Sequence, residues 1–261
     1  MVTKRIIIVG GGGLAWSLIE GISKSSCFEI VGVWVRRSEA AQQITDHFGL
    51  FATNIFEELP LADVYILAVS DGAIREVSES LPFPEGALVA HVSGSSPLKL
   101  ISSKIENRAV IYPMQTFTQG RHVDWHNVYI FVEGVSEECC VIAEQIAKEL
   151  SPDKVSRLSS QQREVLHVAA VFGSNFTNAL LGVAAEQLHS IGLHLSIFKQ
   201  LLEETIDKAM DSDDPSSIQS GPAIRGDLIT QKRHLTHIED EELREIYKLL
   251  SSMIWKTSKK N

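Results

Sequence analysis

The stretch of sequence that decides the fold is Ile6-Ile7-Ile8-Val9-Gly10-Gly11-Gly12-Gly13-Leu14-Ala15. Its four β-branched residues predict a buried strand, and the glycines that follow match the pattern G-x-G-x-x-A at Gly10, Gly12 and Ala15. In such a turn Gly10 permits the tight bend, Gly12 leaves room for a diphosphate at the helix N-terminus, and Ala15 lets the helix pack close to the strand. The motif therefore predicts a dinucleotide site, the alternative being a flexible glycine turn that binds nothing.

The rest of the first half alternates short β-branched runs with amphipathic segments, which is typical of βαβ units and a parallel sheet. Further strands are expected at residues 29–35, 64–69, 88–92, 109–112 and 128–132. The pattern becomes helical after Ser151-Pro152, and a capping box is predicted at Ser159 and Gln162. We therefore expect an α/β fold in which a Rossmann doubly wound parallel sheet at residues 1–154 precedes an all-α domain at residues 155–261.

The end of the second expected strand indicates which dinucleotide binds. An NAD site usually carries an acidic residue there, which accepts a hydrogen bond from the ribose 2′-hydroxyl. This chain has Arg36, Arg37 and Ser38 instead, and guanidinium groups suit the additional 2′-phosphate of NADP. The predicted cofactor is NADP, unless the two arginines are ordinary solvated surface residues.

Ligands of doubly wound sheets bind beyond the carboxyl ends of the strands. Val69 and Ser70 end one strand and are expected near the cofactor, whereas Asp71 is expected to cap the next helix. Residues 91–97 and 112–117 follow two further strands and could bind a substrate carboxylate or carbonyl, although ordinary turns have the same composition. The residues predicted to contact the cofactor are Gly10, Gly12, Gly13, Leu14, Ala15, Arg36, Arg37, Ser38, Val69, Ser70 and Ser93.

A polar stripe crosses the apolar helix expected at residues 159–190. His167, Ser174 and Asn178 fall within about 40° of one another at ~3.6 residues per turn, with Asn175 beside them. A polar stripe on an apolar helix requires partners or a wet cleft, and a cleft between the two domains would provide one. We predict catalytic roles for His167, Ser174, Asn175 and Asn178, the alternative being an internal network or a polar seam at a subunit interface.

Composition limits the classes of partner. The chain of 261 residues has a formal net charge of −9, which disfavours nucleic acid and anionic membranes. Its three cysteines form no disulfide or zinc pattern, and His122 and His126 lack a third ligand nearby, so no metal site is predicted. The apolar run at residues 6–9 is too short for a signal peptide, and no stretch is expected to reach the length of a membrane span. We expect a cytoplasmic protein with a small-molecule substrate.

Together these residues resemble a family of bacterial Rossmann-like proteins with a C-terminal helical domain of unknown function, distantly related to pyrroline-5-carboxylate reductase and the β-hydroxyacid dehydrogenases. The likeness extends over nearly the whole chain and rests on Gly10-x-Gly12-x-x-Ala15, His91-Val92-Ser93-Gly94, Pro113-x-Gln115-Thr116-Phe117, His167 with Ser174-Asn175, and Gly221-Pro222 with Arg225-Gly226-Asp227. The resemblance implies an NADP-binding oxidoreductase-like protein that forms a homodimer through its helical domain. Arg225 could hold an acidic substrate, and Asp227 could cap a helix.

The chain departs from these relatives at two points. The β-hydroxyacid dehydrogenases carry a catalytic lysine on the long helix, yet residues 159–191 contain no lysine, and Tyr112 stands where several relatives have histidine. Both departures argue against alcohol oxidation by a lysine base. The predicted function is an NADP-dependent oxidoreductase that reduces a small C=O or C=N substrate at the interdomain cleft, with His167 as a source of protons. The alternative is a non-catalytic NADP-binding sensor or scaffold that acts through its helical domain.

Overall fold

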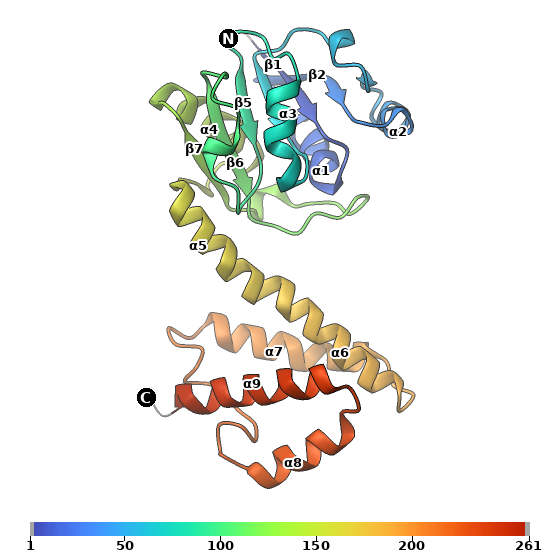
Figure 1. The fold of residues 1–261 in the computed structure, drawn as a ribbon, viewed down its shortest axis with the longest axis vertical. Helices are drawn as coiled ribbons and strands as arrows, with labels where there is room; N and C mark the ends of the chain where they lie inside the picture. The colour runs from blue at the N-terminus through green and yellow to red at the C-terminus, as the bar shows by residue number, and fades with distance from the viewer. Residues whose placement is uncertain (1–2, 259–261) are drawn as a thin grey trace. The chain divides into compact units, whose positions relative to one another are not determined.

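The computed structural model describes residues 3–258, and the chain divides into two compact units at residues 1–176 and 177–261. The first unit contains an eight-stranded sheet in the order β3-β2-β1-β4-β5-β6-β7-β8 (Figure 1). Strands β6 and β7 pair antiparallel, whereas the other neighbouring strands pair parallel. This topology confirms the predicted α/β class with a Rossmann-type sheet.

The strands are β1 (Lys4–Val9), β2 (Phe28–Trp34), β3 (Ala52–Thr53), β4 (Val64–Leu67), β5 (Leu88–His91), β6 (Arg108–Pro113), β7 (Ile130–Gly134) and β8 (Val155–Arg157). The α-helices are α1 (Gly13–Ile22), α2 (Ser38–Phe48), α3 (Ile74–Ser80), α4 (Glu137–Leu150), α5 (Ser160–Ala170), α6 (Thr177–His189), α7 (Lys199–Met210), α8 (Leu228–His237) and α9 (Glu241–Ser258). A π-helix spans Val171–Phe176, and short 3₁₀ helices form at Phe56–Glu58, Asp71–Ala73, Leu98–Leu100, Trp125–Asn127 and Leu195–Phe198.

Strand β1 lies in the interior of the sheet and is buried on both faces. Ile6 and Ile8 belong to a hydrophobic cluster that includes side chains of α1, α2 and α4. Ile7 and Val9 belong to a second cluster, which includes side chains of α3. Because successive side chains of a strand point to opposite faces, the two clusters are the two covered faces that a parallel sheet requires.

The six strands predicted from the sequence all form, within a few residues of their expected ends. Strands β3 and β8 are not predicted, because they are two and three residues long and carry no extended apolar run. Strand β8, helix α5 and the π-helix belong to the sheet-bearing unit, although they lie beyond residue 154. For this reason the first compact unit ends at residue 176, later than the predicted domain boundary.

Residues 160–189 form one helical run composed of α5, the π-helix and α6. The predicted capping box at Ser159 and Gln162 is present at its start. The run is long and apolar enough to cross a membrane, so the expectation that no stretch reaches this length is wrong; helices that pack against protein meet the same criteria. The π-helix has i→i+5 hydrogen bonds, so the predicted spacing of ~3.6 residues per turn does not hold between His167 and Asn178.

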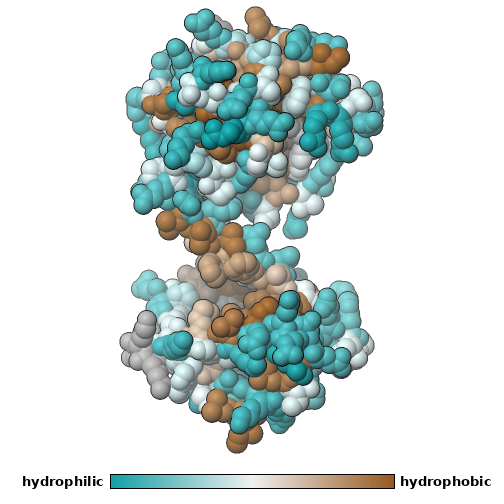
Figure 2. Space-filling model, in the orientation of Figure 1, coloured by the Kyte–Doolittle hydropathy of each residue, from teal (hydrophilic) through white to brown (hydrophobic). Residues whose placement is uncertain are grey.

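Residues 177–258 of the second unit form the helices α6 to α9, which are joined by loops and one 3₁₀ turn. Asp227 caps α8 as predicted, and its carboxylate accepts a hydrogen bond of 2.9 Å from the Thr230 amide. Within residues 177–258 the buried apolar side chains are Leu188 and Ala223 alone. Many apolar side chains therefore remain on the surface of this unit, where Figure 2 shows several of them gathered together.

His91 ends strand β5 with a side chain that is completely buried. Its Nδ1 accepts a hydrogen bond of 3.2 Å from the Ser93 amide, which places the ring proton of the neutral form on Nε2. Burial lowers the pKa of His91 to about 4, and the nearby Arg163 guanidinium contributes to the same shift. The imidazole is therefore neutral in the folded protein at neutral pH.

The low pKa of His91 predicts a loss of stability in mild acid. The unfolded chain binds a proton near the ordinary pKa of about 6.5, whereas the folded chain does so only near 4, so stability is full above pH 6.5 and falls between these values. The expected contribution of His91 is about 3 kcal/mol. Urea unfolding at several pH values should show a shallower decline for His91→Asn, because an amide oxygen can replace the Nδ1 acceptor without titrating. An unchanged pH dependence in this variant would contradict the prediction.

Candidate functional site

The glycines after β1 differ in what a side chain at each position would meet. Gly10 has a φ of +134°, and a Cβ built there would lie 2.2 Å from the Ala68 carbonyl oxygen, so the fold itself requires glycine. A Cβ at Gly13 would lie 2.7 Å from the Phe117 carbonyl oxygen. A Cβ at Gly12 would meet nothing within 4 Å. Gly12 therefore faces open space at the start of α1, where a ligand can approach the backbone closely.

The N-terminus of helix α1 is suited to an anion. Gly12 is its N-cap and supplies no side-chain hydrogen bond, and the first turn contains no acidic residue. The free N–H groups of this turn and the helix dipole therefore favour a negative charge beside Gly12.

A cavity of about 470 Å³ begins at this helix terminus and extends along the carboxyl ends of β2 and β4. Predicted cofactor residues among its lining are Gly10, Gly12, Arg36, Arg37, Val69 and Ser70. The sequence reasoning missed Glu76 and Ser80, which line the cavity from α3. The sequence could not identify these two residues, because polar residues that line a cavity and polar residues that face solvent look alike on an amphipathic helix.

Other predicted cofactor residues lie outside the cavity lining. Ala15 is fully buried and Leu14 packs against the core, so both support the turn from within. Ser38 is the exposed first residue of α2, and Ser93 lies in the loop after β5. Their roles toward a cofactor stay predictions.

Arg36 and Arg37 are both exposed at the mouth of the cavity. Within residues 3–258 neither guanidinium forms an ion pair with a carboxylate. Two unpaired guanidinium groups beside a cavity are able to bind a phosphate group with several hydrogen bonds.

Asp71 does not cap the following helix as predicted. It is the first residue of a 3₁₀ helix whose N-cap is Ser70, and its Oδ2 accepts a hydrogen bond of 2.6 Å from the Ser95 hydroxyl. This bond links the loops that follow β4 and β5. The expectation was wrong because a side-chain partner distant in sequence competes with local capping.

Tyr112 and His167 meet beside Gly94. The Tyr112 hydroxyl lies 3.4 Å from His167 Nδ1, and a Cβ at Gly94 would lie 2.6 Å from that same nitrogen. Burial raises the pKa of Tyr112, so its hydroxyl remains protonated at neutral pH. The pair can therefore hold or pass on a proton at the carboxyl end of β6.

The other predicted catalytic residues do not join this pair. Ser174 and Asn175 lie in the π-helix, Asn178 lies in α6, and all three side chains are exposed. π-Helical segments occur frequently at functional sites, which keeps these residues as candidates. Arg225 is likewise exposed in the second unit, and its predicted contact with a substrate stays a prediction.

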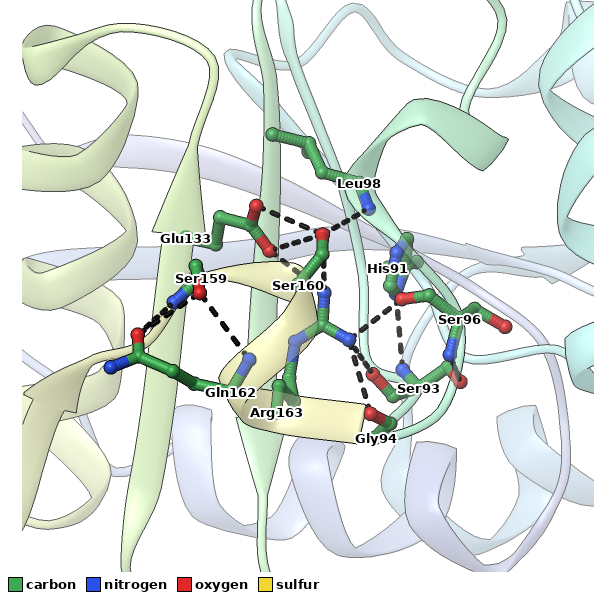
Figure 3. A network of polar contacts seen from close by, with 10 residues as sticks. All are labelled: His91, Ser93, Gly94, Ser96, Leu98, Glu133, Ser159, Ser160, Gln162 and Arg163. Atoms are coloured by element: carbon green, nitrogen blue, oxygen red, sulfur yellow. Dashed lines mark hydrogen bonds and ion pairs between the residues drawn. The ribbon is translucent and has the colours of Figure 1, made fainter. Parts of the chain in front are cut away.

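Arg163 is the functional candidate that sequence reasoning missed most clearly. Only 1% of its surface is exposed, although it carries a positive charge. One terminal nitrogen donates to the carbonyl oxygens of Ser93, Gly94 and Ser96 at 3.3, 3.1 and 2.6 Å. The other lies 2.8 Å from Glu133 Oε2 (Figure 3). The sequence contained one weak indication of a special role for this residue: Arg163 is the sole arginine or lysine between residues 159 and 191.

Ser160 completes the network around Arg163. Its hydroxyl is 2.8 Å from Glu133 Oε2 and accepts a hydrogen bond of 3.0 Å from the Leu98 amide. The first turn of α5 is thus fastened to β7 and to the loop after β5 (Figure 3). The residues of this network are distant from one another in the sequence, so no local motif could predict the network.

The described residues contain no group of three side chains suited to hold a metal ion. His122, one of the two histidines considered for this role, instead lies 2.9 Å from Glu20. The candidate site comprises the cavity at Gly12, the exposed Arg36 and Arg37, and the Tyr112–His167 pair.

Comparison with known proteins places this site in a family context. A domain of unknown function, DUF2520, matches residues 128–254. A Bacteroides fragilis protein described as an NADP oxidoreductase is 33% identical, with 97% of this chain and 98% of that chain covered at a TM-score of 0.90. No curated protein matches the sequence.

Two more distant structures share the fold. The 1-pyrroline-5-carboxylate reductase of Streptococcus pyogenes is 15% identical, covers 99% of both chains and has a TM-score of 0.64. The reductive aminase of Aspergillus terreus, solved with NADPH and ethyl levulinate, is 13% identical, with 100% of this chain and 95% of that chain covered at a TM-score of 0.73. The chain thus belongs to the Rossmann-like proteins that carry a C-terminal helical domain of unknown function.

Proposed function

We propose that the protein is an NADP-dependent oxidoreductase that reduces a small C=N or C=O substrate. The observation that carries the proposal is the single cavity that joins an uncapped helix N-terminus at Gly12 to the free guanidinium groups of Arg36 and Arg37. The helix terminus suits the diphosphate of a dinucleotide, and the arginines suit its 2′-phosphate. The similarity to a protein described as an NADP oxidoreductase supports the same cofactor.

The cofactor assignment predicts a selective loss of affinity. Replacing Arg36 and Arg37 together by glutamine should raise the Kd for NADPH about 10- to 100-fold, because charge-assisted hydrogen bonds to the 2′-phosphate are lost. The Kd for NADH should change little. Fluorescence titration of the reduced nicotinamide measures both values, and Arg75→Gln, an exposed arginine paired with Glu79, is the matched control. Equal effects on NADPH and NADH would contradict the assignment.

The proposed reaction uses the hydride of the nicotinamide, and the chain's own residues supply position and protons. The Tyr112 hydroxyl and His167 lie at the carboxyl ends of the sheet strands, where ligands of such folds bind. His167 would give a proton to the substrate nitrogen or oxygen, and the exposed Asn175 and Asn178 would orient the substrate. An imine requires less acid catalysis than a ketone, which suits a site without lysine. That the second unit contributes Asn178 to this site stays a prediction.

The proposed chemistry predicts substrate-dependent oxidation of NADPH. Cyclic imines, including 1-pyrroline-5-carboxylate, should be reduced faster than ketones of the same size, as measured by loss of absorbance of the reduced nicotinamide. His167→Ala should lower kcat about 10²- to 10⁴-fold and leave the Kd for NADPH unchanged. His126→Ala, at an exposed position in the 3₁₀ helix Trp125–Asn127, is the control. Tight NADPH binding without turnover of any imine or ketone would instead favour the sensor or scaffold.

We also propose that the protein forms a homodimer through its helical domain. Ile229, Met210 and Leu249 are 84%, 80% and 68% exposed, which is unusual for apolar side chains of this size unless another protein covers them. The helical run at residues 160–189 would likewise pack against protein rather than lipid, because the exposed Glu164 and Glu186 interrupt its apolar surface. Because the helical run would be covered by protein, we also propose that the protein is cytoplasmic.

The dimer proposal predicts a concentration-dependent assembly. Sedimentation at micromolar concentration should show twice the chain mass of 28.8 kDa. Combining Ile229→Glu with Met210→Glu should shift the protein toward the monomer, because charges would be buried in an apolar interface. Leu61→Glu, at a leucine 71% exposed on the first unit, should leave the dimer intact. A monomeric wild-type protein at these concentrations would rule the dimer out.

A further inference from the structure

The buried guanidinium of Arg163 fixes the orientation of the peptide groups that follow β5. One of its terminal nitrogens donates hydrogen bonds of 3.3 and 3.1 Å to the carbonyl oxygens of Ser93 and Gly94. No described peptide bond is cis, and in a planar trans peptide the C=O and the N–H point in opposite directions. The amides of Gly94 and Ser95, which belong to these two peptide groups, therefore point away from Arg163.

The amides of the buried Gly94 and the exposed Ser95 have no hydrogen-bond partner among the described residues. Within residues 3–258 neither the Gly94 nor the Ser95 amide donates a hydrogen bond, whereas the neighbouring Ser93 and Ser96 amides both do. Two successive free amides on one side of a loop form a small concave site for a negatively polarised oxygen. Hydrogen bonding of their carbonyls to a guanidinium also polarises the peptide groups and strengthens the amides as donors.

The position of the loop connects these amides to the proposed reaction. It follows the carboxyl end of β5, and Gly94 contacts both Tyr112 and His167, since a Cβ there would lie 2.6 Å from each side chain. An oxygen bound at the amides would therefore lie next to the groups that we assign to proton transfer.

We propose that the amides of Gly94 and Ser95 bind an acceptor oxygen of a carboxylate or carboxamide group, and that Arg163 is the positioning residue that presents them. This inference rests on the proposed function, because the oxygen would belong to the substrate carboxylate or to the nicotinamide carboxamide. Arg163 is neutralised by Glu133, and Asp71 adds a negative charge beside Ser95. These charges disfavour a full carboxylate relative to a neutral amide oxygen. The experiment below distinguishes the substrate carboxylate from the nicotinamide carboxamide.

The direct test follows the amide resonances of Gly94 and Ser95 in ¹⁵N-labelled wild-type protein. A shift with NADP but not with 2′-phospho-ADP-ribose, which lacks the nicotinamide, identifies the carboxamide. A shift with proline but not with pyrrolidine, which lacks the carboxylate, identifies the substrate group. Absence of any shift with NADP and with proline, at concentrations that saturate the protein, would overturn the proposal. The titration with proline requires no cofactor. A failure of NADP to bind would therefore count against the proposed function, while the proline titration would still test the inference about the two amides.

Variants test the role of Arg163 separately. Arg163→Met should raise the Kd for NADP or the KM of a carboxylate-bearing imine about 10- to 100-fold, according to which group binds. Arg163→Lys should recover part of the loss, because an ammonium group retains the charge and some of the hydrogen bonds. Arg157→Met removes an exposed arginine that pairs with Glu137 and should change neither constant.

A purely structural role for Arg163 gives a different result. It would lower the stability of Arg163→Met and leave Kd, KM and the amide shifts of the folded fraction unchanged. That outcome would overturn the proposal. Should Arg163→Met fail to fold, Glu133→Gln removes the partner of Arg163 while retaining a similar shape, and the same constants are measured.

Discussion

The architecture depends on the complete burial of strand β1 between two hydrophobic layers. Ile6 to Val9 have no exposed surface, and their side chains alternate between the cluster of α1, α2 and α4 and the cluster of α3. Because both faces are covered, the strand cannot shift its register without moving apolar groups from one layer to the other. The end of β1 is therefore fixed in space. The turn that follows it, with Gly10 against the Ala68 carbonyl, opens the cavity at a defined place.

A second constraint operates at the start of helix α5. Removing the charge of Arg163 from water costs several kcal/mol, which its ion pair and hydrogen bonds must offset. Three carbonyl oxygens and one carboxylate contact its two terminal nitrogens, and these contacts exist only when the loop after β5, β7 and α5 adopt their observed positions. The buried Nε has no partner among the described residues. Burial lowers the pKa of His91, and the charge of Arg163 adds to this shift. The amides of Gly94 and Ser95, in the same loop, have no hydrogen-bond partner within residues 3–258.

Much of the fold could be predicted because it depends on local patterns. The alternation of β-branched runs with amphipathic segments located six strands, and the residues Ser159 and Gln162 located the start of α5. The short strands β3 and β8 could not be found, because two or three residues carry too little periodicity. The π-helix at Val171–Phe176 was also missed, and it altered the expected alignment of His167 with Asn178.

The sequence by itself determined the Rossmann-type sheet, the helical second half and the residues that could hold a dinucleotide, since each depends on neighbours within a few positions. Tertiary structure alone decided that Gly12 faces open space while Gly10 and Gly13 face backbone, that Asp71 accepts from Ser95, and that Arg163 is buried against Glu133. The physical reason is the same in each case. Hydrogen bonds between residues 24 to 70 positions apart, and steric contacts such as that of Gly13 with Phe117, exist only after the chain has packed, and no local pattern encodes them.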